Sequence, residues 1–156
     1  MADETRAGPA GRVLATNIKR IRDAQRLTYT KLSKMLAEAG RDLPILALRR
    51  IERMERRVDF DDLLALAYVL RVCPVDLMVS SEASDEPYAL TPEHEFEADT
   101  VREWIRGEDV LLAPVSSPGD PFSDPGTAML DAIQWMPADR RKRVMRRWLD
   151  NEEEHQ

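Results

Sequence analysis

Apolar residues recur at helical spacing through the first half of the chain. Within residues 12–26 they fall at positions i, i+4 and i+7, which are Leu14, Ile18 and Ile21. This spacing places all three on one face of an amphipathic helix. Residues 1–11 hold Gly and Pro and have no such periodicity, so we expect them to form a flexible leader.

Capping residues predict where the next helices begin. Thr28 is a good N-cap for a second helix, because its hydroxyl can accept from the free amides of the next turn. Pro44 suits the first position of a third helix, where no amide hydrogen is needed. Asp59 begins a sequence that resembles a capping box for a fourth helix, and a short fifth helix is expected over 73–78. Short connections make these five helices one compact all-α domain, residues 12–79.

The second half of the chain has a different composition. Residues 80–90 are rich in Ser, Asp, Glu and Pro and are expected to be a linker. We expect residues 91–156 to form a helical C-terminal region that begins with a short helix over 98–106. A Pro- and Gly-rich loop is expected near 108–126. Two further helical segments follow it, and Pro137 breaks them apart.

Charge is unevenly distributed along the 156 residues, whose formal net charge is −6. Residues 1–78 hold 15 Lys and Arg against 11 Asp and Glu, whereas residues 79–156 hold 8 against 18. Between Lys19 and Arg57, 12 basic residues stand against 5 acidic ones. Such an asymmetry is typical of a basic binding face with an acidic neighbouring module.

Several classes of protein lack support in the sequence. Cys73 is the only cysteine, which excludes an internal disulfide and makes the cytoplasm the expected compartment. No apolar run approaches the roughly 20 residues of a membrane span. His94 and Glu95 begin an HExx sequence, but Ala98 stands where a zinc protease needs its second histidine. We therefore expect no enzyme, no catalytic residues, no metal and no cofactor.

The run from Asn17 to Met78 resembles the Cro/cI-type helix-turn-helix domain, or Xre family, of bacterial and phage repressors. The resemblance rests on four segments: IKRIRDAQRLT, KLSKML, LRRIERMERRV and DDLLALAYVLRVCPVDLM. It implies a five-helix lambda-repressor-like DNA-binding domain followed by a partly helical C-terminal extension. The third helix, at about 44–54, would enter the major groove while the second crosses the DNA backbone.

The resemblance also assigns roles to individual residues. At the start of the second helix, the residues that would meet phosphate are Thr28, Tyr29 and Thr30. On the recognition helix, those that would face base edges or flanking phosphates are Ile45, Leu46, Arg49 and Arg50. Beside the phosphate backbone would lie Arg53, Arg56 and Arg57. Glu52 matches the family's glutamate that forms a structural pair with an arginine of the first helix, here Arg22.

The chain departs from the family pattern at several of these positions. The family usually has glutamine where Tyr29 stands and polar residues where Ile45 and Leu46 stand. Apolar groups contact a thymine methyl but discriminate little between bases, so we expect Arg49 to make the guanine contact. The family has glycines, which end helices in the left-handed conformation, at the positions of Met54 and Arg71. The connection between the second and third helices is also longer than usual.

Two functions follow as expectations. The first is a sequence-specific regulator of transcription, most simply a repressor, that binds double-stranded DNA as a homodimer. The alternative is an antitoxin-like or adaptor protein whose C-terminal half binds a protein partner. Apolar residues of that half would form either an internal core or a self-association surface: Trp135, Met136, Met145, Trp148 and Leu149. The basic run 140–147 is expected to be a solvated helix face, with auxiliary contact to DNA as the alternative.

Overall fold

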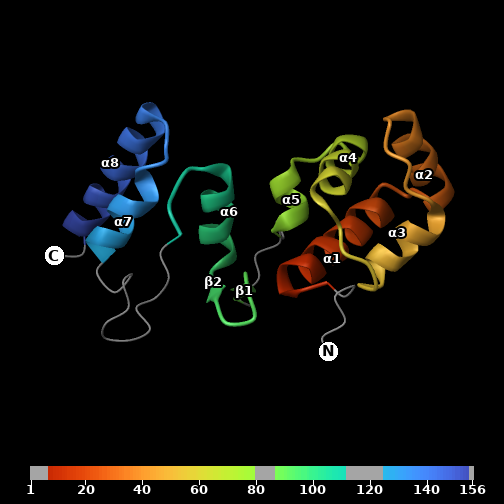
Figure 1. The fold of residues 1–156 in the computed structure, drawn as a ribbon, viewed down its shortest axis with the longest axis horizontal. Coiled ribbons are helices and arrows are strands. Elements are labelled where there is room, and N and C mark those ends of the chain that lie inside the picture. The colour runs from red at the N-terminus through yellow and green to blue at the C-terminus, as the bar shows by residue number, and fades with distance from the viewer. Residues whose placement is uncertain (1–6, 80–86, 112–124, 155–156) are drawn as a thin grey trace. The chain divides into compact units, whose positions relative to one another are not determined.

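A computed structural model describes residues 7–79, 87–111 and 125–154 of the chain (Figure 1). The described part is mostly helical, with eight helices, as the sequence predicts, and it also holds one short two-stranded sheet that was not predicted. It divides into two compact units, Met1–Ala98 and Asp99–Gln156, which we call unit 1 and unit 2.

Helix α1 (Pro9–Ala24) begins three residues earlier than predicted. The predicted leader, 1–11, is therefore wrong at its end, because its last residues are helical. Pro9 occupies the first turn, where a missing amide hydrogen is harmless, and the amide of Arg12 already donates to the carbonyl of Gly8 at 2.9 Å. The apolar periodicity starts only after this turn, so it could not mark the true beginning.

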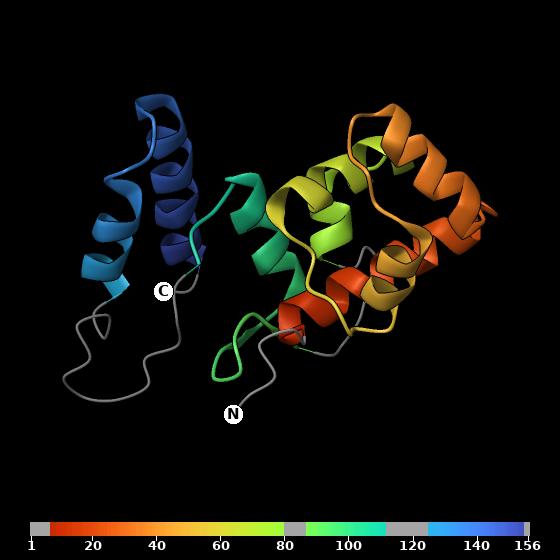
Figure 2. The same cartoon turned by 45° about the vertical axis from the view of Figure 1, so that its right-hand side comes forward.

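Helix α2 (Tyr29–Glu38) begins after Thr28, whose hydroxyl accepts from the amide of Lys31 at 3.2 Å. The helix is followed by Gly40 with φ of +86°. Helix α3 (Ile45–Glu52) begins after Pro44. Helices α2 and α3 pack against each other and lie side by side in both views (Figures 1 and 2).

Helix α4 (Phe60–Leu70) begins after Asp59, whose carboxylate accepts from the amide of Asp62 at 2.7 Å. A last short helix of this bundle, α5 (Pro74–Met78), follows it. The two positions where the family has glycine do adopt left-handed backbone, with φ of +63° at Met54 and +58° at Arg71.

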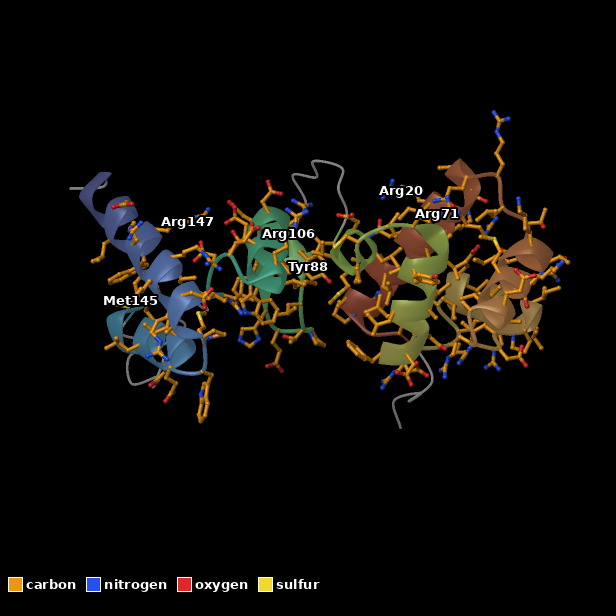
Figure 3. All side chains as sticks on the ribbon, turned by 90° about the horizontal axis from the view of Figure 1, so that it is seen from above. Arg20, Arg71, Tyr88, Arg106, Met145 and Arg147 are labelled. Atoms are coloured by element: carbon orange, nitrogen blue, oxygen red, sulfur yellow. The ribbon has the colours of Figure 1, made fainter. Side chains whose placement is uncertain are left out.

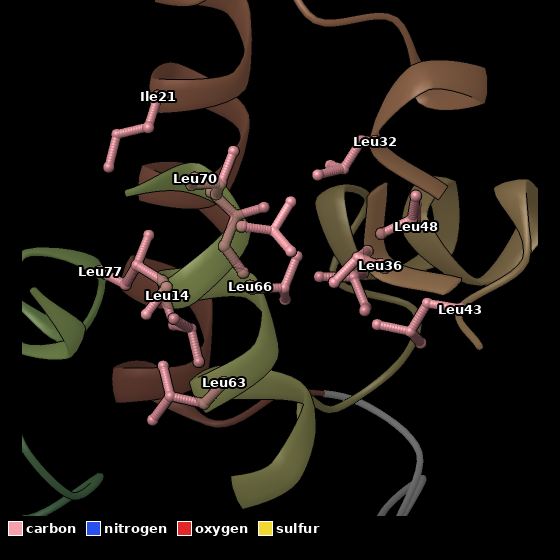
Figure 4. Packing of buried hydrophobic residues seen from close by; sticks show 14 of the residues in the cluster. Leu14, Ile21, Leu32, Leu36, Leu43, Leu48, Leu63, Leu66, Leu70 and Leu77 are labelled. Atoms are coloured by element: carbon pink, nitrogen blue, oxygen red, sulfur yellow. The ribbon is translucent and has the colours of Figure 1, made fainter. Parts of the chain in front are cut away.

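The five helices of unit 1 close around one apolar core (Figure 4). Each helix from α1 to α5 contributes at least one fully or nearly fully buried aliphatic residue: Ile18, Leu32, Leu36, Leu48, Ile51, Leu66, Leu70 and Leu77. The buried amide of Asn17 donates to the carbonyl of Leu77 at 3.0 Å, which ties α1 to α5. This core holds α3 with its apolar side inward and its other side exposed.

A two-stranded antiparallel sheet follows, with β1 (Tyr88–Ala89) paired to β2 (Glu95–Phe96). The predicted linker, 80–90, is therefore wrong at its end, and unit 1 extends to Ala98 instead of residue 79. Tyr88 is buried, and its hydroxyl donates to the carbonyl of Met78 at 3.0 Å. Strands of two residues are too short to show an alternating pattern, so hydrophobic periodicity does not predict them.

Unit 2 contains α6 (Ala98–Arg106), α7 (Pro125–Ile133) and α8 (Ala138–Glu154). Helix α6 and the break at Pro137 agree with the sequence, whereas the end of the predicted loop, 108–126, belongs to α7. Most of that loop, 112–124, lies outside the described residues. A small core joins α7 and α8, formed by Val110, Met129, Ile133 and Val144 with Met136 and Trp148 against it.

One ion pair links two helices of unit 2. Arg147 of α8 binds Glu103 of α6 at 2.7 Å, and Met145 of the same helix is more than one-third exposed (Figure 3). Of the helices described, none is both long enough and apolar enough to cross a membrane.

Candidate nucleic-acid interface

The outer face of α3 carries the exposed residues of that helix. Leu48 and Ile51 point into the core, with 1% and 0% of their surface exposed. At 100° per residue, the side opposite them holds four exposed side chains. These are Leu46, Arg49 and Arg50 of α3, with Arg53 at its C-cap. We call this set the α3 face: three guanidinium groups around one leucine, itself 68% exposed.

A buried ion pair fixes α3 to α1. Two nitrogens of the Arg22 guanidinium donate to the two carboxylate oxygens of Glu52, at 2.6 and 2.9 Å. Only 3% of the Glu52 side chain is exposed. The hydrogen bond to Glu52 raises the pKa of the Arg22 guanidinium. A further nitrogen of Arg22 donates to the carbonyl of Leu27 at 2.9 Å, so the pair also braces the entry to α2.

Tyr29 is joined to this pair. Its hydroxyl donates to Glu52 at 2.7 Å, and burial together with that bond raises the pKa of the Tyr29 hydroxyl. The guanidinium of Arg22 lies over the Tyr29 ring, 4.3 Å from its centre. The guanidinium of Arg49 lies 5.4 Å from the same centre, within the range of a cation–π contact. The ring therefore stands beside the α3 face, with its hydroxyl turned inward.

A second ion-pair cluster holds both loops that flank α3. Asp62 of α4 is fully buried and accepts from Arg41 at 2.7 Å and from Arg56 at 2.9 Å. Arg41 lies in the α2–α3 connection and also binds Asp59 at 2.9 Å. The hydrogen bond to Asp62 raises the pKa of the Arg41 guanidinium. The hydroxyl of Ser33, in α2, donates to the carbonyl of buried Leu43 in the same connection at 2.7 Å.

The predicted site residues thus fall into two groups. Exposed residues that keep their side chains available at the surface are Thr30, Leu46, Arg49, Arg50 and Arg53. Thr28 is engaged as a cap, Ile45 is half-buried, and the guanidinium of Arg56 is bound to Asp62.

The sequence missed Arg41 and Asp62 as partners. In a capping box that begins at Asp59, the Asp62 side chain would turn back to the start of α4. The structure shows that carboxylate bound to the two arginines instead, while only the Asp62 amide joins the cap.

Metal binding finds no support in the described ranges, where no three His, Cys, Asp or Glu side chains gather as ligands. Comparison of the chain with protein-family models, with curated proteins and with solved structures finds no match in any of the three.

Proposed function

We propose that unit 1 is a lambda-repressor-like, Cro/cI-type helix-turn-helix domain that binds duplex DNA in a sequence-specific way. The chain would act as a homodimeric regulator of transcription, with α3 in the major groove. One observation carries the proposal: two arginines of a short helix, and a third at its C-cap, line its outer side, while its inner side is buried. We also propose that the protein is cytoplasmic, because the chain has a single cysteine and so no internal disulfide.

The fixed position of α3 supports this proposal. Glu52 at its end is tied to α1, and the loops on both sides are tied to Asp62. A reading helix needs such restraint, because base recognition depends on side chains held in a defined place. An ordinary solvated helix does not require buried ion pairs on both flanks.

The exposed residues divide into three roles. Arg49 would bind the O6 and N7 atoms of a guanine, which is the commonest specific contact of arginine. Arg50, Arg53 and Thr30 would bind phosphates and position the helix without reading sequence. Leu46 would contact a thymine methyl. Tyr29 would hold the Arg49 guanidinium through its ring, since the Tyr29 hydroxyl is already bound to Glu52.

Selection of binding sites from random duplexes tests the proposal. The full-length protein should enrich one common sequence, and its affinity should fall steeply with salt because bound arginines release counterions. Enrichment without any common sequence contradicts specific regulation. No retention of duplex DNA at low salt contradicts DNA binding altogether.

A second candidate function is that of an adaptor or antitoxin-like protein. It is favoured by exposed apolar side chains in unit 2: Leu130, Trp135 and Leu149. Co-purification of a stoichiometric protein partner through residues 91–156, with no DNA binding by the whole chain, would support this candidate over the first.

A further inference from the structure

Helix α4 exposes a row of large apolar side chains on the side away from the core. Phe60, Leu64 and Tyr68 stand at positions i, i+4 and i+8, and they are 71%, 43% and 76% exposed. This spacing aligns them on one face of the helix. An aligned apolar row that faces water is a mark of an interaction surface, whereas single exposed apolar residues are ordinary.

The charges at the two ends of this row are of opposite sign. Asp61, exposed, lies in the first turn of α4, and Arg71, also exposed, follows its last residue (Figure 3). A row with Leu64 at its middle, an acid at one end and a base at the other is complementary to itself when reversed. Two copies in antiparallel orientation bring Leu64 against Leu64 and Asp61 to the level of Ala67 of the other copy. From there the Arg71 backbone is about 6 Å further along the helix axis, which the long arginine side chain can span.

A hollow beside the row fits the same arrangement. Met35, Glu38, Ala39, Tyr68, Val69 and Arg71 line a hollow of about 350 Å³ between the ends of α2 and α4. Reversal about Leu64 brings Phe60 of a second copy to the level of Tyr68, at the edge of this hollow. A hollow of this size accepts one phenyl ring.

We propose that the α4 row (Phe60, Leu64 and Tyr68) pairs with the same row of a second copy of this chain about a two-fold axis. Each Phe60 enters the hollow beside the other copy's Tyr68. Such an isologous contact closes on itself and makes a dimer with no further growth. The pairing does not depend on DNA binding, but its effect on operator affinity rests on the proposed function.

The size of the row sets the strength of the contact. Two aromatic rings and one leucine, exposed to these fractions, offer on the order of 400 Å² per copy. A standard interface buries about 800 Å² per partner, so this one belongs to the weak class. The dimer should therefore dissociate in the micromolar range, and two adjacent half-sites on DNA should drive its formation.

Sedimentation equilibrium of the full-length protein tests the pairing directly. Wild type should show a monomer–dimer equilibrium that Leu64→Glu abolishes, because two carboxylates then meet at the axis. Leu130→Glu, an exposed leucine of α7, is the matched control and should leave the dimer intact. Asp61→Arg and Arg71→Asp should each weaken the dimer at least threefold, and the double variant should regain wild-type association.

Circular dichroism verifies that each variant keeps its helix content. A wild type that stays monomeric to several hundred micromolar overturns the pairing and means that the row is covered within one chain or by another partner. A dimer that Leu130→Glu dissolves and Leu64→Glu leaves intact overturns it in favour of unit 2.

Binding to DNA separates this inference from the proposed function. Leu64→Glu should bind a duplex with one half-site as wild type does, and lose at least tenfold in affinity for two inverted half-sites. If no duplex is bound but Leu64→Glu still dissolves the dimer, the pairing stands and the proposed function fails. If Leu64→Glu binds both duplexes with wild-type affinity, pairing through α4 does not contribute to operator binding, and that part of the inference is overturned.

Discussion

The Arg22–Glu52 pair allows a quantitative test of how α3 is held. Arg22→Met keeps most of the side-chain length but removes the guanidinium. Glu52 would then lie buried, at 3% exposure, with only the Tyr29 hydroxyl as a donor. Removal of one partner of a buried pair costs about 3–5 kcal/mol, because an uncompensated charge stays behind.

The double variant Arg22→Met/Glu52→Met removes both charges and should cost much less. Its remaining cost comes from the Tyr29 hydroxyl and the Leu27 carbonyl, which lose their partners, and should be about 1–2 kcal/mol. If each single substitution costs about 3–5 kcal/mol, the two together exceed the cost of the double variant by at least about 4 kcal/mol, and this excess is the coupling between them.

Urea unfolding followed with two spectroscopic probes measures the loss of stability in unit 1, which contains Arg22 and Glu52. All three tryptophans, Trp104, Trp135 and Trp148, lie in unit 2, so their fluorescence reports that unit alone. Far-UV circular dichroism reports both units. Arg22→Met should move the dichroism midpoint down by roughly 2 M urea and leave the fluorescence midpoint in place. A loss below about 1 kcal/mol, or costs that simply add in the double variant, would refute a buried charge pair as the restraint on α3.

Three other predictions concern DNA contact, backbone strain and pH. Arg49→Ala should relax specificity at one base pair, with about 1–3 kcal/mol lost on the best sequence, whereas Arg53→Ala should weaken all sequences equally in gel-shift titrations. Arg26→Gly should stabilise unit 1 by about 0.5–1 kcal/mol, since Arg26 has φ of +53°, and Gly40→Ala should destabilise it by about as much, both measured by urea unfolding. Burial raises the pKa of the Tyr88 hydroxyl above its usual 10.0. The stability it contributes is therefore present below the unfolded-state pKa and lost as the pH rises through the folded one, so unfolding midpoints should fall above about pH 10 in wild type and less steeply in Tyr88→Phe. Equal pH slopes for these two proteins would contradict that assignment.

Signals that are local in sequence were sufficient for most helices. The Thr28 cap and the break at Pro137 depend on a residue and its near neighbours, and the structure has both. The Arg22–Glu52 contact spans 30 residues, and only the resemblance to a family implied it. Where the family has no matching residue, as at Tyr29, the sequence could not show that the hydroxyl turns inward.

Other features were indicated neither by local sequence patterns nor by the resemblance to a family. The bonds to Asp62 come from Arg41 and Arg56, 21 and 6 residues away. Both arginines lie on irregular segments, where no fixed spacing applies. The sheet rests on one buried ring, Tyr88, and on strands of two residues. The pairing proposed for α4 likewise emerged only when burial distinguished the inner from the outer apolar residues of a helix that is apolar on most sides.

The carboxylate of Asp62 has a consequence for how the domain tolerates change. Asp62 holds the loop before α3 and the loop after it. A longer α2–α3 turn therefore does not make the position of α3 less defined. Helix α4 carries this carboxylate on its inner side and the apolar row on its outer side. In a dimer paired through α4, the separation of the two α3 helices would then be set by one rigid helix per copy. Variation in turn length would leave operator spacing unchanged, while a substitution that shifts α4 would change it.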